Sequence, residues 1–296
     1  MNSFYWSEKD VSFLRENYQI YGSQYCSKIL NRARSSIVCK ANKIGLFISK
    51  ELWSKLKCKP YHLLDIPVDN FSVNITPESA YVLGILWADG SVEKSGKVRI
   101  GLVKQDMNDI ECVFDKLGKW KKRDKQLINR QLQRHIGTNS KILSNFLQSH
   151  NYISKSTSSA DSILSIIPDN LKHYWFRGLF DGDGHIRKNR NEFSISSNYY
   201  QDWTYLIELS KKFGMKYHVR KQKLISKAGK EHSSSCFSCS HAMSMYKFFE
   251  FIYFNYENDN IGLKRKYKEW INRKSLFIEK SKHENWRINH AYRFLV

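Results

Sequence analysis

The sequence predicts an α+β protein built by duplication, with two αββαββα halves related by pseudo-two-fold symmetry and a small three-helix domain before them. Two observations carry this prediction. The segment ESAYVLGILWADGSV (78–92) is similar to KHYWFRGLFDGDGHI (172–186), and matched residues lie 94 positions apart. Alternating strand patterns and amphipathic helices then follow each segment in the same order, as an internal duplication requires.

Composition narrows the class of protein and its partners. The 296 residues include 49 Lys and Arg against 28 Asp and Glu, a formal net charge of +21 that is spread along the chain. An excess of this size attracts a polyanion, so nucleic acid is the first partner to consider. No apolar run is long enough to cross a membrane, the N-terminus has no secretory signal, and six irregularly spaced Cys make no disulfide framework. We therefore expect a soluble intracellular protein without a membrane partner.

The first 50 residues predict three short helices. Ser7 and Asp10 form a capping box for the first, and the others fit residues 23–30 and 35–44. The turn between the second and third helix indicates a helix-turn-helix, and residues 6–46 resemble Myb/SANT-like modules. The alternative is a small basic helical domain with solvated side chains. On the third helix, the residues suited to phosphates and base edges are Arg34, Lys40, Asn42 and Lys43.

The two repeats then follow a linker over 51–75. In the first repeat, 76–167, we expect a helix from Thr76, a strand over 98–103, a helix over 106–117, strands over 119–124 and 126–136, and a helix over 140–149. In the second repeat, 168–273, we expect a helix from Pro168, a strand at 193–195, a helix over 201–213, strands over 215–224 and 233–240, and a helix over 242–254. Residues 274–296 form a basic C-terminal tail.

Small residues recur at i and i+4 on the first helix of each repeat. They are Gly84 with Ala88, and Gly178 with Gly182. Residues at this spacing share one helix face, so the two helices can approach closely and pack side by side.

Each of these helices ends in Asp-Gly, so close packing brings Asp89 and Asp183 together. Helix C-termini are negative, and the two carboxylates therefore repel unless a hard cation lies between them. Mg²⁺ is the cation that favours carboxylate oxygens and phosphate, and Mn²⁺ is the expected substitute.

The segments VLGILWADG and FRGLFDGDG resemble the two signature motifs of LAGLIDADG homing endonucleases, and the resemblance extends over residues 76–272. It implies a monomer whose two sheets form a saddle over DNA and which makes a double-strand break across the minor groove. It also implies that Asp89 and Asp183 bind the metal ions, assisted by the backbone carbonyls of Ala88 and Gly182. The sixth motif position is acidic in many members of the family. It is Asp181 in the second copy but Trp87 in the first, and we interpret Trp87 as a packing residue.

The resemblance further implies one basic residue near each half of the site. Lys155 is the candidate in the first repeat, and Lys264 and Lys266 remain alternatives in the second. For each of them, a phosphate contact away from the cut is an equally good interpretation. Gln105, expected at the end of a strand, is a further polar candidate.

DNA contacts are expected from strands and one turn. Arg99, Gly101, Val103, Ser194 and Ser196 lie on candidate DNA-facing strands. The cations expected in the turn after the first strand of the second repeat are Arg187, Lys188 and Arg190, for which a solvated loop is the alternative.

Two other sites are less well supported. Cys236 and Cys239 form a CxxC with histidines nearby, but in a strand these positions point to opposite faces, which disfavours zinc. His185 follows the second Asp-Gly, where a DNA or backbone contact is a simpler role than general base.

The leading functional hypothesis is a site-specific homing endonuclease that hydrolyses both DNA strands with Mg²⁺ at a long recognition site. The alternatives are an intron RNA maturase, with host intron RNA as its partner, and a non-catalytic DNA-binding regulator. Neither alternative needs both aspartates, so their retention favours cleavage. The ends of the chain lack splice-junction residues, so we expect a free-standing protein and not an intein. The abundance of Lys, Asn, Ile and Ser points to an AT-rich phage or organellar genome.

Overall fold

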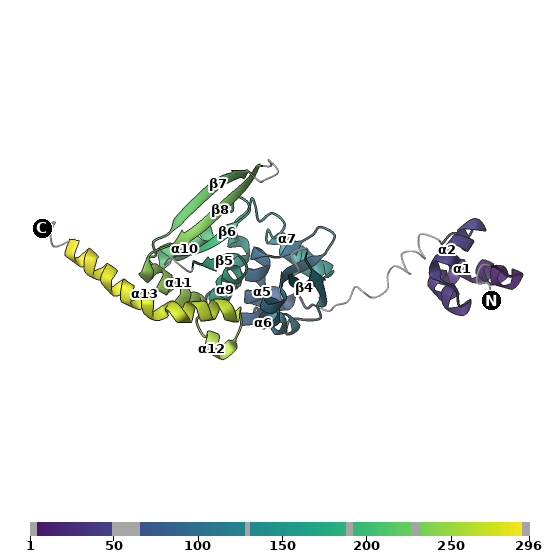
Figure 1. Cartoon of the computed structure of the whole chain (residues 1–296), viewed down its shortest axis with the longest axis horizontal. Coiled ribbons are helices and arrows are strands. Elements are labelled where there is room, and N and C mark those ends of the chain that lie inside the picture. The colour runs from purple at the N-terminus through teal and green to yellow at the C-terminus, as the bar shows by residue number, and fades with distance from the viewer. Residues whose placement is uncertain (1–4, 49–65, 128–130, 188–191, 226–230, 292–296) are drawn as a thin grey trace. The chain divides into compact units, whose positions relative to one another are not determined.

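The computed structural model describes residues 5–48, 66–127, 131–187, 192–225 and 231–291 (Figure 1). The chain divides into two compact units, Met1–Leu63 and Leu64–Val296. Within the described ranges, no helix has both the length and the apolar character needed to cross a membrane.

The smaller unit contains α1 (Glu8–Ile29) and α2 (Arg34–Lys43) around its own small core. The predicted capping box is present, because the Ser7 hydroxyl accepts from the Asp10 N–H at 3.1 Å and the Ser7 N–H donates to the Asp10 carboxylate at 3.3 Å. Gly22, with φ of 76°, kinks α1 where the first two predicted helices were separated. The left-handed backbone at this position favours glycine.

The larger unit begins with the first repeat. The elements, in order, are α4 (Asp69–Ser72), α5 (Pro77–Ala88), β1 (Ser91–Val92), β2 (Val98–Val103), α6 (Lys104–Asp115), β3 (Lys121–Gln126), β4 (Leu132–Thr138), α7 (Lys141–Ser149) and α8 (Asp161–Leu164). Thr76 caps α5 by accepting from the Ser79 N–H, and Pro77 occupies the first turn, as the sequence predicts.

The second repeat has the same succession of elements. They are η1 (Asp169–Leu171), α9 (Lys172–Asp183), β5 (Gly184–Ile186), β6 (Phe193–Ser197), α10 (Thr204–Lys212), β7 (His218–Ile225), β8 (Glu231–Cys239), α11 (Ala242–Ile252), α12 (Tyr256–Asp259) and α13 (Lys264–Ala291).

Two four-stranded antiparallel sheets confirm the predicted α+β class. Their strand orders are β1-β2-β4-β3 and β5-β6-β8-β7, so the second sheet repeats the topology of the first. In β2, Val98, Ile100 and Leu102 are buried against the helices while Arg99 is exposed, which is the period of two expected of a half-buried strand.

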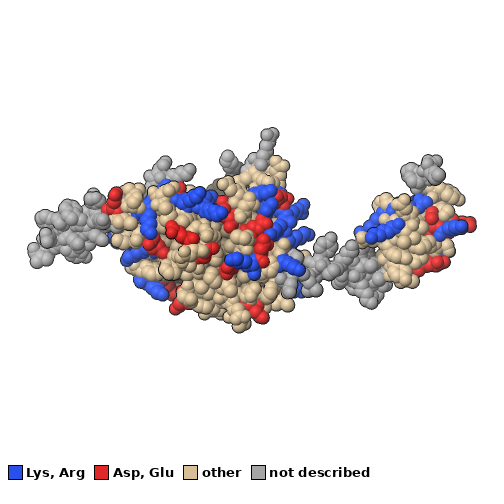
Figure 2. All heavy atoms as spheres, turned by 90° about the horizontal axis from the view of Figure 1, so that it is seen from below, with Lys and Arg blue, Asp and Glu red and all other residues tan. Residues whose placement is uncertain are grey.

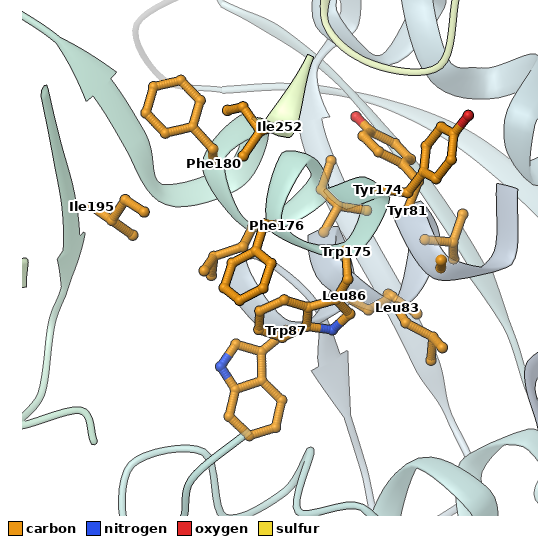
Figure 3. Packing of buried hydrophobic residues seen from close by; sticks show 14 of the residues in the cluster. Tyr81, Leu83, Leu86, Trp87, Tyr174, Trp175, Phe176, Phe180, Ile195 and Ile252 are labelled. Carbon is orange, nitrogen blue, oxygen red and sulfur yellow. The ribbon is translucent and has the colours of Figure 1, made fainter. Parts of the chain in front are cut away.

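The core of the larger unit is centred on α5 and α9, which lie side by side between the two sheets (Figure 1). Residues 79–87 of α5 are all buried, and a helix that is buried all round needs apolar residues on every face. In Figure 3, Trp87 of α5 and Trp175 of α9 lie next to each other, with ring centroids 6.3 Å apart. The predicted packing role of Trp87 agrees with its exposed fraction of 1%.

Several predicted boundaries differ from the structure. The strand expected over 126–136 is β4 at Leu132–Thr138. The helix expected over 106–117 is α6, which begins at Lys104, so Gln105 lies in this helix and not on a strand. The helix expected from Pro168 begins at Lys172 after a short 3₁₀ turn. Phe71 of α4, in the expected linker, is fully buried, and α13 continues to Ala291 through residues expected as a tail.

Candidate active site

The backbones of α5 and α9 touch where the sequence places glycines. A Cβ added to Gly84 would overlap the carbonyl oxygen of Trp175, and one added to Gly178 would overlap that of Tyr81. No side chain larger than hydrogen can therefore stand between the helices at these two positions. The predicted close approach is present.

This approach brings the two Asp-Gly helix ends together. A Cβ added to Gly182 would overlap the Cβ of Ala88 and would lie 3.2 Å from the Asp89 carboxylate. Asp89 therefore lies beside the residue that precedes Asp183. Ala88 and Gly182 thus contribute both to the helix contact and to the walls of the site.

The two carboxylates influence each other electrostatically. Desolvation and, to a smaller extent, the negative charge of Asp89 together raise the pKa of Asp183 to about 7, against the opposing charges of Lys155 and Lys266. Desolvation also raises the pKa of Asp89, although its side chain reaches solvent and the ammonium groups of Lys266 and Lys155 oppose the shift. A pair of desolvated like charges is costly to ionise, so the site favours an added positive charge.

Lys155, which follows α7, donates to the carbonyl end of α5. Its Nζ lies 2.7 Å from the Trp87 carbonyl oxygen and 2.9 Å from that of Gly90, with those of Leu86 and Ala88 at 3.3 Å. These oxygens form the negative end of the helix, so the ammonium group stabilises that end. Burial lowers the pKa of Lys155 to about 8, against the opposing charges of both site aspartates.

Lys266, in the first turn of α13, makes the matching contacts with α9. Its Nζ donates to the carbonyl oxygens of Phe180 and Asp181 at 2.7 Å each and of Gly184 at 2.6 Å. These residues lie 94 positions after three of the four that Lys155 contacts. Lys266 is buried, and this burial lowers its pKa to about 8. The two lysines therefore occupy equivalent places in the two repeats.

The neighbours of Lys266 point elsewhere. Lys264 is exposed and lies 3.8 Å from the Asp109 carboxylate of α6. Arg265 makes two bonds of 2.7 Å to the Asp106 carboxylate. Of the three consecutive cations, only Lys266 reaches the helix end, and the other two join α13 to the first repeat.

Asp181 is bonded to residues of the core and is not part of the site. Its Oδ2 accepts from the Tyr81 hydroxyl at 2.8 Å and from the Leu263 N–H at 2.9 Å, and the residue is buried. Burial raises the pKa of Asp181 to about 6. These bonds join α5, α9 and the start of α13, so Asp181 has a structural position.

The residues expected to contact DNA do not all lie together. Arg99 is exposed on β2, Gln105 is exposed on α6, and Arg187 lies just after β5 with its Nε 3.6 Å from Glu192. Lys188 and Arg190 lie outside the described residues. In the smaller unit, Lys43 and Asn42 are exposed, Arg34 donates to the Ser23 hydroxyl at 2.9 Å, and the Lys40 Nζ lies 5.8 Å from the Trp6 ring centroid.

The cations of β3 are further candidates for DNA contact that the sequence pattern did not single out. The strand KKRDKQ has no apolar residue and is exposed throughout, so it has the composition of a loop. Its register with β4 places Lys121, Arg123 and Lys125 on the outward face of the sheet. The signal available in the sequence was the alternation itself, with cations at every second position.

The two lysines are expected to differ in their effect on stability. Replacing Lys266 with Met removes its hydrogen bonds to three carbonyl oxygens at the end of α9, and we expect the free energy of unfolding to fall by about 3 kcal/mol. Lys155→Met should cost about 1 kcal/mol, because water can reach the carbonyl oxygens that the half-buried Lys155 leaves. Urea denaturation measures both changes. Lys264→Met, on an exposed side chain of the same helix, is the matched control, and equal losses for Lys155 and Lys266 would contradict the difference in burial.

Comparison with known proteins places this architecture. Residues 164–246 match the family model described as "Homing endonuclease". Comparison with curated proteins gives no match. Among solved structures, the chain is similar to full-length DUF199/WhiA from Thermatoga maritima at 14% identity and a TM-score of 0.41, covering 79% of this chain and 71% of that one.

Two further solved structures are similar to this chain. The homing endonuclease I-WcaI bound to its DNA recognition sequence has 13% identity and a TM-score of 0.42, with 76% of this chain and 95% of that one covered. Mesophilic variants of the homing endonuclease I-DmoI have 16% identity and a TM-score of 0.37, with 60% and 96% covered. The family match spans α9, with its Asp-Gly end, and the whole second sheet, and the first repeat has the same topology. Residues 164–246 therefore carry a match to the homing endonuclease family.

Proposed function

We propose that the chain is a site-specific DNA endonuclease that hydrolyses one phosphodiester bond in each strand with the help of Mg²⁺. The observation that carries this proposal is the meeting of Asp89 and Asp183 at the touching ends of α5 and α9. Binding alone gives no reason to hold two like-charged carboxylates together at a cost in stability. A metal-dependent reaction does.

The donor set suits a hard divalent cation. The carboxylates of Asp89 and Asp183 and the backbone oxygens of Ala88 and Gly182 are all oxygen ligands. In the described part of the chain, no group of three or more His, Cys, Asp or Glu side chains is placed to hold a metal ion by itself. Water and DNA phosphate would complete the coordination. When bound, Mg²⁺ would supply Lewis-acid stabilisation of phosphate oxygens and a more acidic water.

The remaining residues of the site orient these ligands. Lys155 and Lys266 hold the carbonyl ends of α5 and α9 in place and so fix the direction of both aspartates. Their ammonium groups also keep positive charge close to the position at which a phosphodiester would enter, since both lower the pKa of Asp89. Such fixed charge stabilises negative charge that develops on phosphate.

DNA is the substrate that the rest of the molecule favours. The net charge of +21 attracts a polyanion, and cations occur on the outward face of the first sheet. An RNA maturase or a DNA-binding regulator would use the same charge but would not require both aspartates. Their presence supports cleavage over these alternatives.

The direct test is cleavage mapping on a randomised or genomic DNA library. With Mg²⁺ we expect double-strand breaks at one long sequence, and with EDTA we expect binding to the same sequence without breaks. Mn²⁺ should restore cleavage. DNA binding without any cleavage in either metal would favour the regulator, and preferential binding of structured RNA would favour the maturase.

Metal binding should also be visible without DNA. Mg²⁺ at 100 times its dissociation constant is expected to raise the free energy of unfolding by about 2.7 kcal/mol, because it binds the folded site and relieves the repulsion there. Thermal unfolding in Mg²⁺ and in EDTA measures this shift. The double variant Asp89→Asn/Asp183→Asn should lose it, and a shift of the same size in the variant would place the metal elsewhere.

A further inference from the structure

The outward faces of the two sheets can be compared position by position. Ser91 and His185 lie 94 residues apart, as the repeats require, and they pair with Arg99 and Ser194 respectively. Residues directly opposite each other on antiparallel strands share a face, so pairing extends the comparison across each sheet. Arg99 is thus equivalent to Ser194.

The same comparison can be extended through β4 and β8 to β3 and β7, the last strands of the two sheets. Arg99 pairs with Gly137, which pairs with Lys121 of β3, while Ser194 pairs with Ser238, which pairs with His218 of β7. The same alternation then continues along both strands. The further equivalent pairs on β3 and β7 are Arg123 with Arg220, and Lys125 with Gln222.

The first sheet presents cations at four of these positions. They are Arg99, Lys121, Arg123 and Lys125, and no acidic residue shares their face among the described strand residues. His135 lies between these cations on β4, and their charges act on it. Desolvation lowers its pKa, and the charges of Lys125, Arg99 and Arg123 lower it further. Arg99 also lies 3.4 Å from Glu93, so the three β3 residues are the main cations of this face.

The second sheet presents hydroxyl groups instead. At equivalent positions it has Ser196 for Gly101, Ser234 for Gln133 and Ser238 for Gly137, and Ser194, which is buried, for Arg99. The cation of its outward face on β7 is Arg220. By the alternation of the strand, Lys221 and Lys223 point to the other face, and the Lys221 Nζ lies 5.9 Å from the Tyr200 ring centroid.

The first sheet also has cations on its inward face, where acids share the surface with them. On the inward face, Lys122 bonds to Glu111 and Asp115, and Arg134 bonds to Glu111 and Asp124 at 2.6 and 2.7 Å. The face seen in Figure 2 shows Lys and Arg side chains at one end of the larger unit with Asp and Glu beside them. Net charge alone therefore does not mark the binding face, whereas the outward face of β3 has cations only.

We propose that the two sheets bind the two half-sites of the DNA by different means, with the first sheet as the electrostatic anchor and the second as a largely non-ionic reader. This inference rests on the proposed function for the DNA itself. Cations neutralise phosphates and give an affinity that falls steeply with salt. Serine hydroxyls and the glutamine amide form hydrogen bonds to phosphates, sugars or base edges, which depend little on salt.

The test compares two variants that lose the same charge. One is Lys121→Gln/Arg123→Gln/Lys125→Gln on β3, and the other is Arg220→Gln/Lys221→Gln/Lys223→Gln on β7. The affinity of each full-length variant for the cleavage site is measured in EDTA between 50 and 200 mM salt, with circular dichroism and thermal unfolding as checks of the fold. Between 50 and 200 mM salt, the affinity of the β3 variant should fall about 40-fold less than that of the wild type, because three phosphate contacts are lost. The affinity of the β7 variant should fall only about fourfold less than that of the wild type, because Arg220 alone of its three cations lies on the outward face.

The outcomes separate this inference from the function on which it rests. Equal changes in the salt dependence of the two variants, or a larger change in the β7 variant, would overturn the division between the sheets. Cleavage by the wild type would, in that case, still support the proposed function. Wild-type protein that binds no DNA would overturn both. Base substitutions in the target should, in addition, cost more affinity per position in the half-site protected by the second sheet, and the opposite bias would contradict its role as reader.

Discussion

Replacing Asp89 or Asp183 with Asn is expected to reduce DNA cleavage at least about 100-fold while leaving DNA affinity nearly unchanged. The two carboxylates lie at the touching ends of α5 and α9, and no other Asp or Glu of the described chain shares that position. An amide keeps the size of the side chain but loses the charge that holds a divalent cation. Gel shift and cleavage on one DNA substrate measure the two quantities separately.

Stability provides the control for this prediction. Because Asp89 raises the pKa of Asp183, the metal-free pair is repulsive, and an Asn variant should unfold in EDTA at the same or a higher temperature than the wild type. Asp69→Asn, at an exposed position in α4, is the matched control and should keep full cleavage. Parallel losses of binding and cleavage, or a marked loss of stability, would contradict the assignment of Asp89 and Asp183 as metal ligands.

The duplicated motif contained enough information to locate the centre of the molecule. Glycines at one helix face and an Asp-Gly end in each copy have few explanations other than two touching helices with paired carboxylates. The structure has this contact at Gly84 and Gly178. Lys155 and Lys266 bind carbonyl groups 94 residues apart, but the two lysines themselves do not follow the repeat spacing and were expected only from the family resemblance.

The choice between Lys264 and Lys266 required the structure because it depends on a helix start. Both lie in the same first turn of α13, where a rotation of the helix decides which side chain faces α9. Asp181 fixes that rotation by accepting the Leu263 N–H at 2.9 Å, and Gly262, with φ of 135°, allows the chain to turn there. No local pattern reveals a bond between residues 82 positions apart.

The outward cations of β3 were missed for a different reason, although a strand was expected over 119–124. A half-buried strand is normally recognised by alternating apolar residues, and β3 has none. The inner side of β3 faces acidic residues of α6 and not apolar ones. The inward Lys122 is paired with Glu111, so the strand satisfies its inner face electrostatically. Tertiary pairing, and not local propensity, defines this strand.

A large loss of stability is expected from filling the contact between the helices. Gly84→Ala or Gly178→Ala should each lower the free energy of unfolding by about 3 kcal/mol, because the new methyl group meets the backbone of the other helix, which has no rotamer to change. Helix propensity acts in the opposite direction and favours alanine by about 1 kcal/mol. The sign of the measured change therefore decides which effect is larger.

Urea denaturation of the single and double variants tests this prediction in full. The double variant Gly84→Ala/Gly178→Ala should lose less than the sum of the single variants, because one separation of α5 from α9 relieves both overlaps. Gly45→Ala, in the smaller unit and with no atom within 4 Å of the added Cβ, is the control and should leave the unfolding of the larger unit unchanged. Separation of the helices also moves Asp89 away from Asp183, so cleavage by the folded single variants should fall even where denaturation is negligible. A stabilised and fully active Gly84→Ala protein would show that the two helices do not touch at this position, and the shared metal site would lose its structural basis.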